Sequence, residues 1–168
     1  MPHEFPFDPL SKLKKTEELQ GLIVAAQRES KIVVLANGCF DLIHVGHVRY
    51  LESARAQGDV LVVAINSDAS VHSLKGMGRP LQSDAERAEI LGSFECVDYT
   101  IIFGAPTVDG LLLQLRPDIQ AKGTDYARET VPERETVRAY GGRVAITGDT
   151  KDHSSRDMIQ NILAKCRS

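Results

Sequence analysis

The sequence predicts an α/β fold of three layers, in which five parallel strands form one sheet with helices on both of its faces. Short runs rich in β-branched residues alternate with segments of helical periodicity along the chain. The two longest runs are apolar almost throughout, which is typical of strands covered on both faces. The chain has 168 residues, 42% of them hydrophobic, which suits one domain with a substantial core.

Five segments have the pattern of strands. "KIVVLAN" and "DVLVVAINS" are the two apolar runs, and "VDYTIIF", "DIQAKG" and "RVAITG" are shorter. These segments predict strands at residues 31–37, 59–67, 97–103, 118–123 and 143–148.

Helical patterns separate the strands. In the helix after the first strand, Val48, Leu51 and Ala54 lie on one stripe, and farther on Ser83 and Glu86 form the sequence pattern of a capping box. Helices are predicted at roughly residues 10–29, 46–57, 83–94, 107–115, 132–140 and 154–165. Because helices alternate with strands, the connections are βαβ crossovers, which are right-handed and make the sheet parallel.

The chain has no internal repeat and no low-complexity linker. We therefore interpret it as a single domain overall, with residues 1–30 as an N-terminal helical extension and residues 31–168 as the main domain.

The composition excludes several classes of protein. The net charge is −3 and the pI is near 5.9, so the chain lacks the basic character of a protein that binds a nucleic-acid polymer. No apolar run reaches transmembrane length, and the first twenty residues lack the apolar region of a secretory signal. The three cysteines are odd in number and far apart, which favours reduced thiols in a cytoplasmic protein and gives no basis for a metal site.

Residues whose side chains can bind ligands or take part in catalysis gather after the strands. The strand ends are "NGCFDLIHVGH", "NSDASVHSLKGMGRP", "FGAPT", "KGTDY" and "TGDTKDHSS", and they hold most of the glycine, histidine, lysine and hydroxyl clusters of the chain. In open parallel sheets, ligands bind beyond the carboxyl ends of the strands. The sequence therefore predicts a binding site at that edge.

Two histidines flank the start of the helix after the first strand. Gly46 lies between His44 and His47, and it leaves room for an anion to approach the free N–H groups of a helix N-terminus. The two imidazoles can add side-chain donors there. A pair of structural histidines is the alternative, and a metal site is less favoured because no third ligand stands at a recognisable spacing. The glycine fingerprint G-x-G-x-x-G of dinucleotide-binding proteins is absent after this strand.

The segment "NGCFDLIHVGHVRYL" resembles the first signature of the cytidylyltransferase-like nucleotidyltransferases, which carry an H-x-G-H motif after the first strand. "HSSRDMI" stands where these proteins have a second signature, a hydroxyl-rich turn opening the last helix. "AINSDASVHSLKGMGRPLQSDAERAEILGSFECVDYTIIF" and "RPDIQAKGTDY" resemble one branch, the adenylyltransferase domain of ADP-heptose synthases. The similarity covers about residues 31–162 and implies a Rossmann-like fold, with residues 31–168 as the nucleotidyltransferase domain.

The resemblance implies transfer of AMP from ATP to D-glycero-D-manno-heptose 1-phosphate, with release of pyrophosphate and formation of ADP-heptose for lipopolysaccharide core biosynthesis. It implies Mg²⁺ bridging phosphate oxygens of ATP, with no metal-binding residues supplied by the protein. No protein nucleophile or general base is needed, because the attacking phosphate is already ionised. Catalysis then depends on positioning and on neutralising charge. Relatives suggest a homodimer.

The resemblance also implies roles for particular residues. His44, His47 and Lys75 would be catalytic, with the histidines donating to the triphosphate. The lysine lies in "LKGMGRP", a glycine-flanked segment able to close over phosphates. The residues expected to bind nucleotide or substrate are Asn37, Gly38, Phe40, Gly46, Arg87, Lys122, Gly123, Asp125, Ser154 and Ser155.

In one place the chain departs from the pattern of its relatives. They usually have Ser-Thr-Thr in the second signature, whereas this chain has Ser154, Ser155 and Arg156. The charge of the arginine stands where a hydroxyl is usual.

Three alternatives remain open from the sequence. The same mechanism could serve CTP with glycerol 3-phosphate or another phosphoalcohol, or GTP with a heptose phosphate. The third alternative is a non-catalytic nucleotide-binding regulatory module, since a fold alone does not imply activity.

Overall fold

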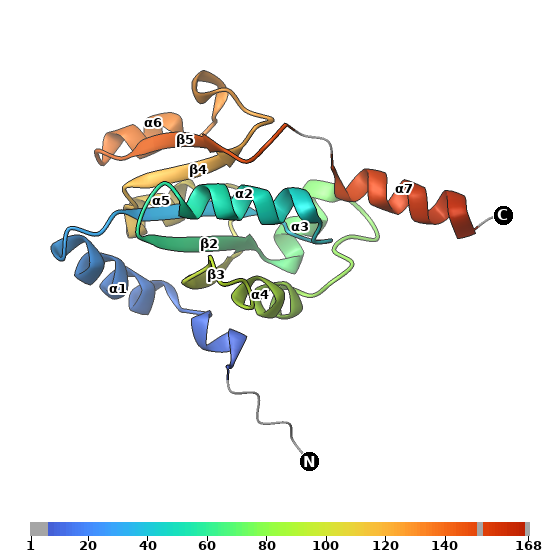
Figure 1. The fold of residues 1–168 in the computed structure, drawn as a ribbon, viewed down its shortest axis with the longest axis horizontal. Helices are drawn as coiled ribbons and strands as arrows, with labels where there is room; N and C mark the ends of the chain where they lie inside the picture. Colours follow the sequence, from blue (N-terminus) through green and yellow to red (C-terminus); the bar gives the residue numbers. More distant parts are fainter. Residues whose placement is uncertain (1–6, 151–152, 167–168) are drawn as a thin grey trace, which may run out of the picture.

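The computed structural model describes residues 7–150 and 153–166, and its centre is a single parallel sheet (Figure 1). The strands are β1 (Val33–Gly38), β2 (Val60–Asn66), β3 (Tyr99–Phe103), β4 (Ile119–Gly123) and β5 (Arg143–Thr147). Their order is β3-β2-β1-β4-β5, and every neighbouring pair is parallel. The predicted five-stranded parallel sheet is therefore confirmed.

The strand order has a switch point next to β1. From β1 the chain adds β2 and β3 on one side, and then crosses over to place β4 and β5 on the other side. Val33 pairs with Val60 of β2, and Val34 pairs with Ile119 of β4. The connections after β1 and β4 therefore leave the sheet in opposite directions and open a crevice at the carboxyl ends of these two strands.

Helices cover both faces of the sheet, as Figure 1 shows. The helices on one face are α2 (Val45–Arg55) and α4 (Asp84–Gly92), and those on the other are α1 (Thr16–Arg28), α5 (Asp109–Leu115) and α6 (Arg134–Ala139). Residues of β1 alternate between these layers, because successive side chains of a strand point to opposite faces. Val34 and Ala36 join the core under α2 and α4, whereas Val33 and Leu35 join the core under α1, α5 and α6.

The N-terminal extension packs as part of the domain. The predicted helix over residues 10–29 is two elements, a 3-10 turn η1 (Pro9–Lys12) and α1. Asp8 caps η1 by accepting a hydrogen bond from the backbone N–H of residue 10. In α1, Leu19 and Ile23 are buried in the same core as β1 and α5, so this helix covers one face of the sheet.

The segment after β2 differs from the sequence prediction. Residues 68–75 were expected to be a loop, but they form a helix, α3 (Asp68–Lys75). Ser67 caps it, because its hydroxyl accepts a hydrogen bond from the N–H of Ser70 at 3.2 Å. Only Ser70 and Val71 of this helix are buried, so it has too short an apolar stripe to give a clear helical pattern.

The last elements are a 3-10 turn η2 (Arg128–Thr130) and α7 (Ser155–Cys166). Among the described residues α7 contains none that is buried, and it extends outward from the body of the domain (Figure 1). None of the helices in residues 7–150 and 153–166 is both long and apolar enough to cross a membrane.

Candidate active site

A cavity of about 1020 Å³ lies at the carboxyl edge of the sheet. The ends of β1, β4 and β5 form its floor, and the first residues of α2 and α7 form two of its walls. It contains every site residue predicted from the sequence except Arg87. The predicted residues that line it are Asn37, Gly38, Phe40, His44, Gly46, His47, Lys75, Lys122, Gly123, Asp125, Ser154 and Ser155.

The turn between β1 and α2 leaves no room for a side chain at residue 46. A Cβ on Gly46 would lie 3.0 Å from the ring of His44 and 3.6 Å from the Cβ of His153. The first distance is shorter than an ordinary van der Waals contact, so the His44 ring would have to move by a few tenths of an ångström to admit a Cβ. Glycine therefore lets the imidazole lie close to the helix N-terminus.

His47 is a neutral hydrogen-bond donor toward the cavity. Its ring stacks on that of His44, with ring centroids 3.9 Å apart, and its Nδ1 accepts the backbone N–H of His44 at 3.3 Å. Burial, with the nearby His44 and Lys75 charges, lowers the pKa of His47 to about 4. At neutral pH the single ring proton is then on Nε2, because Nδ1 is the acceptor. Nε2–H is thus available to an anion in the cavity.

Phe40 supports the His47 ring from behind. It is 4% exposed, and its ring centroid lies 5.3 Å from that of His47 and 6.5 Å from that of Tyr50. Its φ of 50° is in the left-handed region, which costs free energy for a residue with a side chain. The backbone conformation at Phe40 therefore places an aromatic ring under the histidine.

The N-terminus of α7 forms the opposite wall. The hydroxyl of Ser154 accepts the N–H of Asp157 at 3.1 Å and lies 2.6 Å from its carboxylate, so Ser154 caps the helix. The hydroxyl of Ser155 donates to the carbonyl of Leu42 at 3.1 Å. This bond joins the start of α7 to the turn before α2, so two helix N-termini with their positive dipole ends face one cavity.

Lys75 reaches the cavity from the last residue of α3 rather than from a loop. The glycine-flanked segment begins directly after it, and Gly76 and Gly78 have φ of 87° and 80°. Met77 between them is 93% exposed. The exposed part of this segment is therefore short, and it begins directly after Lys75.

The far end of the same segment is fixed by Asp41, which is 3% exposed. Its carboxylate lies 3.0 Å from the guanidinium of Arg79 and accepts the N–H groups of Leu81 at 2.6 Å and Gln82 at 3.2 Å. Arg79 therefore lines the cavity with its position set by a buried carboxylate.

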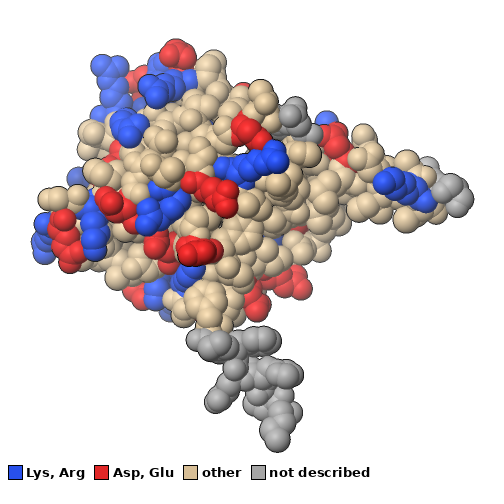
Figure 2. Space-filling model, in the orientation of Figure 1, with Lys and Arg blue, Asp and Glu red and all other residues tan. Residues whose placement is uncertain are grey.

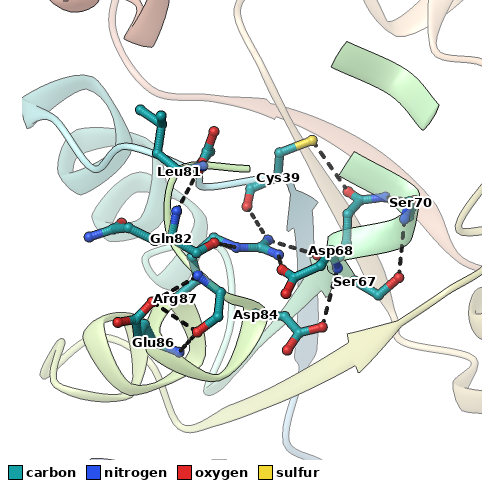
Figure 3. Close-up of polar contacts among 12 residues, drawn as sticks. Cys39, Ser67, Asp68, Ser70, Leu81, Gln82, Asp84, Glu86 and Arg87 are labelled. Atoms are coloured by element: carbon teal, nitrogen blue, oxygen red, sulfur yellow. Dashed lines mark hydrogen bonds and ion pairs between the residues drawn. The ribbon is translucent and has the colours of Figure 1, made fainter. Parts of the chain in front are cut away.

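Arg87 is not among the residues that line the cavity. Figure 3 shows the polar contacts that surround it instead. Arg87 is fully buried and donates to the carbonyls of Cys39 at 2.6 Å, Asn66 at 2.7 Å and Gln82 at 3.1 Å. It also pairs with the carboxylate of Asp68 at 2.8 Å. Arg87 was expected to contact a phosphate, but in the structure its role is to hold the fold together. Its guanidinium joins the carboxyl ends of β1 and β2 to the segment before α4.

The end of β4 carries a buried ion pair. Lys122 is 6% exposed, and its ammonium lies 3.0 Å from Glu133 Oε1 and 5.4 Å from the ring centroid of Tyr126. Next to it, a Cβ on Gly123 would lie 3.1 Å from a carboxylate oxygen of Asp125. The cationic end of Lys122 is therefore fixed between an acid and an aromatic ring at the cavity wall.

Several residues of the cavity were not assigned from the sequence: Cys39, Tyr50, Asn66, Arg79, Thr124, Thr147, Gly148, Asp149, Thr150, His153, Arg156, Asp157, Ile159 and Gln160. Tyr50 could have been found, because it follows His47 by three residues and so shares its helix face. Its hydroxyl donates to the carbonyl of Ala121 at 2.8 Å. Asn66 is likewise at the carboxyl end of β2, as Asn37 is at that of β1.

The charges of the cavity favour a polyanion. Four lysine and arginine side chains (Lys75, Arg79, Lys122 and Arg156), the neutral imidazole of His47 and two helix N-termini converge on it, alongside three aspartates (Asp125, Asp149 and Asp157). In the described residues no group of three or more histidines, cysteines or acids is placed to hold a metal ion. On the face shown in Figure 2, acidic and basic side chains are interspersed.

A doubly wound parallel sheet, with an H-x-G-H turn opening a helix over a large cavity lined by lysine and arginine, defines a nucleotidyltransferase. The cytidylyltransferase-like family model matches residues 35–161, and the chain belongs to that family.

Curated relatives show which branch of the family this chain resembles. "Bifunctional protein HldE" of Syntrophotalea carbinolica is 46% identical over 161 residues, which are 96% of this chain and 32% of that protein. The protein of the same name from Pseudomonas aeruginosa is 44% identical over 149 residues, 89% of this chain and 31% of that one. The chain therefore spans about a third of the length of these curated relatives.

A solved structure has the same fold. The lipopolysaccharide core biosynthesis protein from Thermoplasma volcanium aligns with a TM-score of 0.60 and 26% sequence identity. The alignment covers 69% of this chain and 93% of that one.

Proposed function

We propose that this nucleotidyltransferase transfers AMP from ATP to D-glycero-D-manno-heptose 1-phosphate, producing ADP-heptose and pyrophosphate. The observation that carries the catalytic part is the pair of stacked imidazoles at the N-terminus of α2, with His47 neutral and its proton directed to the cavity. The choice of substrates is supported by the similarity to HldE proteins and to a lipopolysaccharide core biosynthesis protein.

The proposed reaction needs no covalent bond to the protein. A phosphate oxygen of the sugar phosphate forms a bond to the α-phosphorus of ATP, and the bond from that phosphorus to the bridging oxygen breaks. Pyrophosphate leaves with the electron pair. Because the attacking oxygen is already ionised at neutral pH, the protein's contribution is to hold the two reactants in line and to stabilise the growing negative charge.

The arrangement of the residues supports a set of donors for this reaction. His47 Nε2–H and the N–H groups at the start of α2 lie where a triphosphate can accept from them, and the start of α7 faces the same space. Lys75 and Lys122 approach from the ends of α3 and β4 and supply positive charge for the second reactant or for the α-phosphate. Removing one such donor typically costs about 3–4 kcal/mol in the transition state.

The nucleotide substrate is expected to be MgATP. The described lining offers scattered carboxylates rather than a cage, which fits an ion held mainly by phosphate oxygens and water. The ion would add charge neutralisation at the phosphates, while the chain's own side chains orient them.

The test measures pyrophosphate release with Mg²⁺ and D-glycero-D-manno-heptose 1-phosphate, in separate reactions with ATP, CTP and GTP. We expect release with ATP. Release with CTP or GTP alone would mean that the enzyme catalyses the same reaction with a different nucleotide. No release in any of the three, followed by release with CTP and glycerol 3-phosphate, would replace the acceptor. No pyrophosphate release with either acceptor, together with tight nucleotide binding, would support a binding module instead.

A further inference from the structure

The ion pair at the end of β4 joins a cavity residue to a residue outside the cavity. Lys122 lines the cavity, whereas Glu133, the residue before α6, does not. The carboxylate is 7% exposed, and its Oε1 lies 3.0 Å from the ammonium. Its second oxygen, Oε2, is buried without a hydrogen-bond partner among the described residues. Glu133 therefore acts on the cavity through the lysine.

Stability of the fold does not explain this pair. Both partners are buried, since Lys122 is 6% and Glu133 is 7% exposed. Taking two charges out of water is costly, and apolar residues of similar size often replace such a pair without loss of stability. The unpaired Oε2 adds to the cost, because a buried acceptor without a donor loses its hydration. A function in the cavity is a better explanation of why the charges are there.

The contacts of Lys122 leave part of its ammonium for a ligand. One N–H is directed to Glu133, and the ring of Tyr126 lies 5.4 Å away and limits the movement of the charge. A lysine has three N–H donors, so two have no hydrogen-bond acceptor among the described residues. Without the carboxylate, the flexible four-carbon side chain would sample many conformations, and a positive charge at 6% exposure would lack a counter-charge.

We propose that Glu133 is a positioning residue for substrate binding: it holds the Lys122 ammonium at the cavity wall, so that the remaining donors meet an anionic oxygen of a bound substrate. The proposal rests on the proposed function and adds to it a residue that touches neither reactant. The carboxylate keeps the ammonium of Lys122 in one position before the ligand arrives, which lowers the entropic cost of binding.

The test compares Glu133→Gln, Lys122→Met and the double variant with Glu135→Gln as a matched control. Glu135 is two residues farther on, with 68% of its side chain exposed and a surface arginine as its partner. Binding is measured by calorimetry and NMR titration with two probes, MgATP and inorganic phosphate, the group that every acceptor of this class carries. Neither probe requires turnover, so failure of the proposed reaction is a separate result.

We expect Lys122→Met and Glu133→Gln to weaken the same probe, each by about tenfold, and the double variant to be no worse than Lys122→Met alone. The control should bind as the wild type does. The proposal is overturned if Glu133→Gln binds both probes normally, if neither single variant changes either probe, or if the two effects simply add.

A stability measurement excludes a purely structural role. The variant carrying both Lys122→Met and Glu133→Leu replaces the pair by apolar side chains. We expect its urea midpoint to equal or exceed that of the wild type while its affinity for the affected probe falls. A large drop in the midpoint of this double variant would assign the pair to the fold and overturn the proposal.

Discussion

Two helices begin at the cavity, and they are held in very different ways. α2 starts at the H-x-G-H turn and is anchored by Leu51 and Ala54, both fully buried in the core. α7 starts at the serine turn and has no buried residue within Ser155–Cys166. Both offer free N–H groups and a positive dipole end to the same space.

The difference indicates that the two helices have different functions in the cavity. The α2 side is preorganised, because Phe40, with its φ of 50°, and the stacked rings fix His47 before any ligand is present. Preorganised donors need no rearrangement as charge develops, and this is where electrostatic catalysis is strongest. The α7 side is joined to the α2 side through the bond from Ser155 to Leu42. We therefore expect α2 to control turnover and α7 mainly to control nucleotide affinity.

The largest expected effect tests the α2 side. His47→Asn keeps an acceptor near the position of Nδ1 and removes the Nε2 donor. We expect kcat to fall by about a hundredfold or more with the melting temperature nearly unchanged, because a transition-state donor is lost. His47→Ala should lose at least as much. Steady-state kinetics and thermal unfolding check both.

Two further variants control this prediction. His47→Gln carries an amide N–H near the position of Nε2 and should recover part of the activity. His72→Asn changes an exposed histidine outside the cavity and should act as the wild type does. Full activity in His47→Asn would show that the Nε2 donor is not needed for catalysis. The proposed difference between α2 and α7 would then be wrong.

Gly46→Ala should have the next largest effect. The new methyl group would lie 3.0 Å from the His44 ring, so the ring must move. We expect kcat/KM to fall by about 10- to 100-fold, since small displacements in an active site are costly. Gly110→Ala in α5 is the control, because a Cβ there meets nothing within 4 Å. Equal activity of the two variants would mean that the position of His44 does not matter.

Ser155→Ala addresses the α7 side. It removes the hydrogen bond to Leu42, which is worth about 1 kcal/mol net and corresponds to roughly fivefold in binding. We expect KM for ATP to rise by about this factor with kcat little changed. Asn161→Ala, an exposed change farther along the helix, is the control. A loss in kcat without a change in KM would contradict the proposed difference between α2 and α7.

The sequence predicted most of the sheet and of the cavity, and for one reason. Strands covered on both faces give long apolar runs, and the bounds of all five strands differ from the predicted ones by two residues at most. Because parallel strands end at one edge, the residues after each strand had to meet there. Asn37, His47 and Lys122 could therefore be placed together without knowledge of any contact.

The features that the sequence did not predict depend on contacts between distant residues. The resemblance placed Arg87, a residue of α4, at a phosphate, but the fold surrounds its guanidinium with three backbone carbonyls and the carboxylate of Asp68. Glu133 was not considered, since its partner stands eleven residues earlier and on another element. Neither pairing leaves a periodic signal in the sequence.

The smallest expected effect concerns pH and again distinguishes the preorganised side. Burial lowers the pKa of His47 to about 4 in the folded protein, below the value of about 6.5 for an unfolded chain. Between these values the unfolded state binds more protons, so the free energy of unfolding rises with pH across this window and falls on acidification from pH 6.5 to 4.

His47→Asn removes this titration. We therefore expect the variant to lose less stability than the wild type between pH 6.5 and 4.5, by on the order of 1 kcal/mol after solvent screening. Urea unfolding at several pH values measures the difference, and carboxylates that titrate in the same range cancel because both proteins carry them. Parallel curves for the two proteins would show that His47 is not desolvated, and the α2 side would then be no more preorganised than the α7 side.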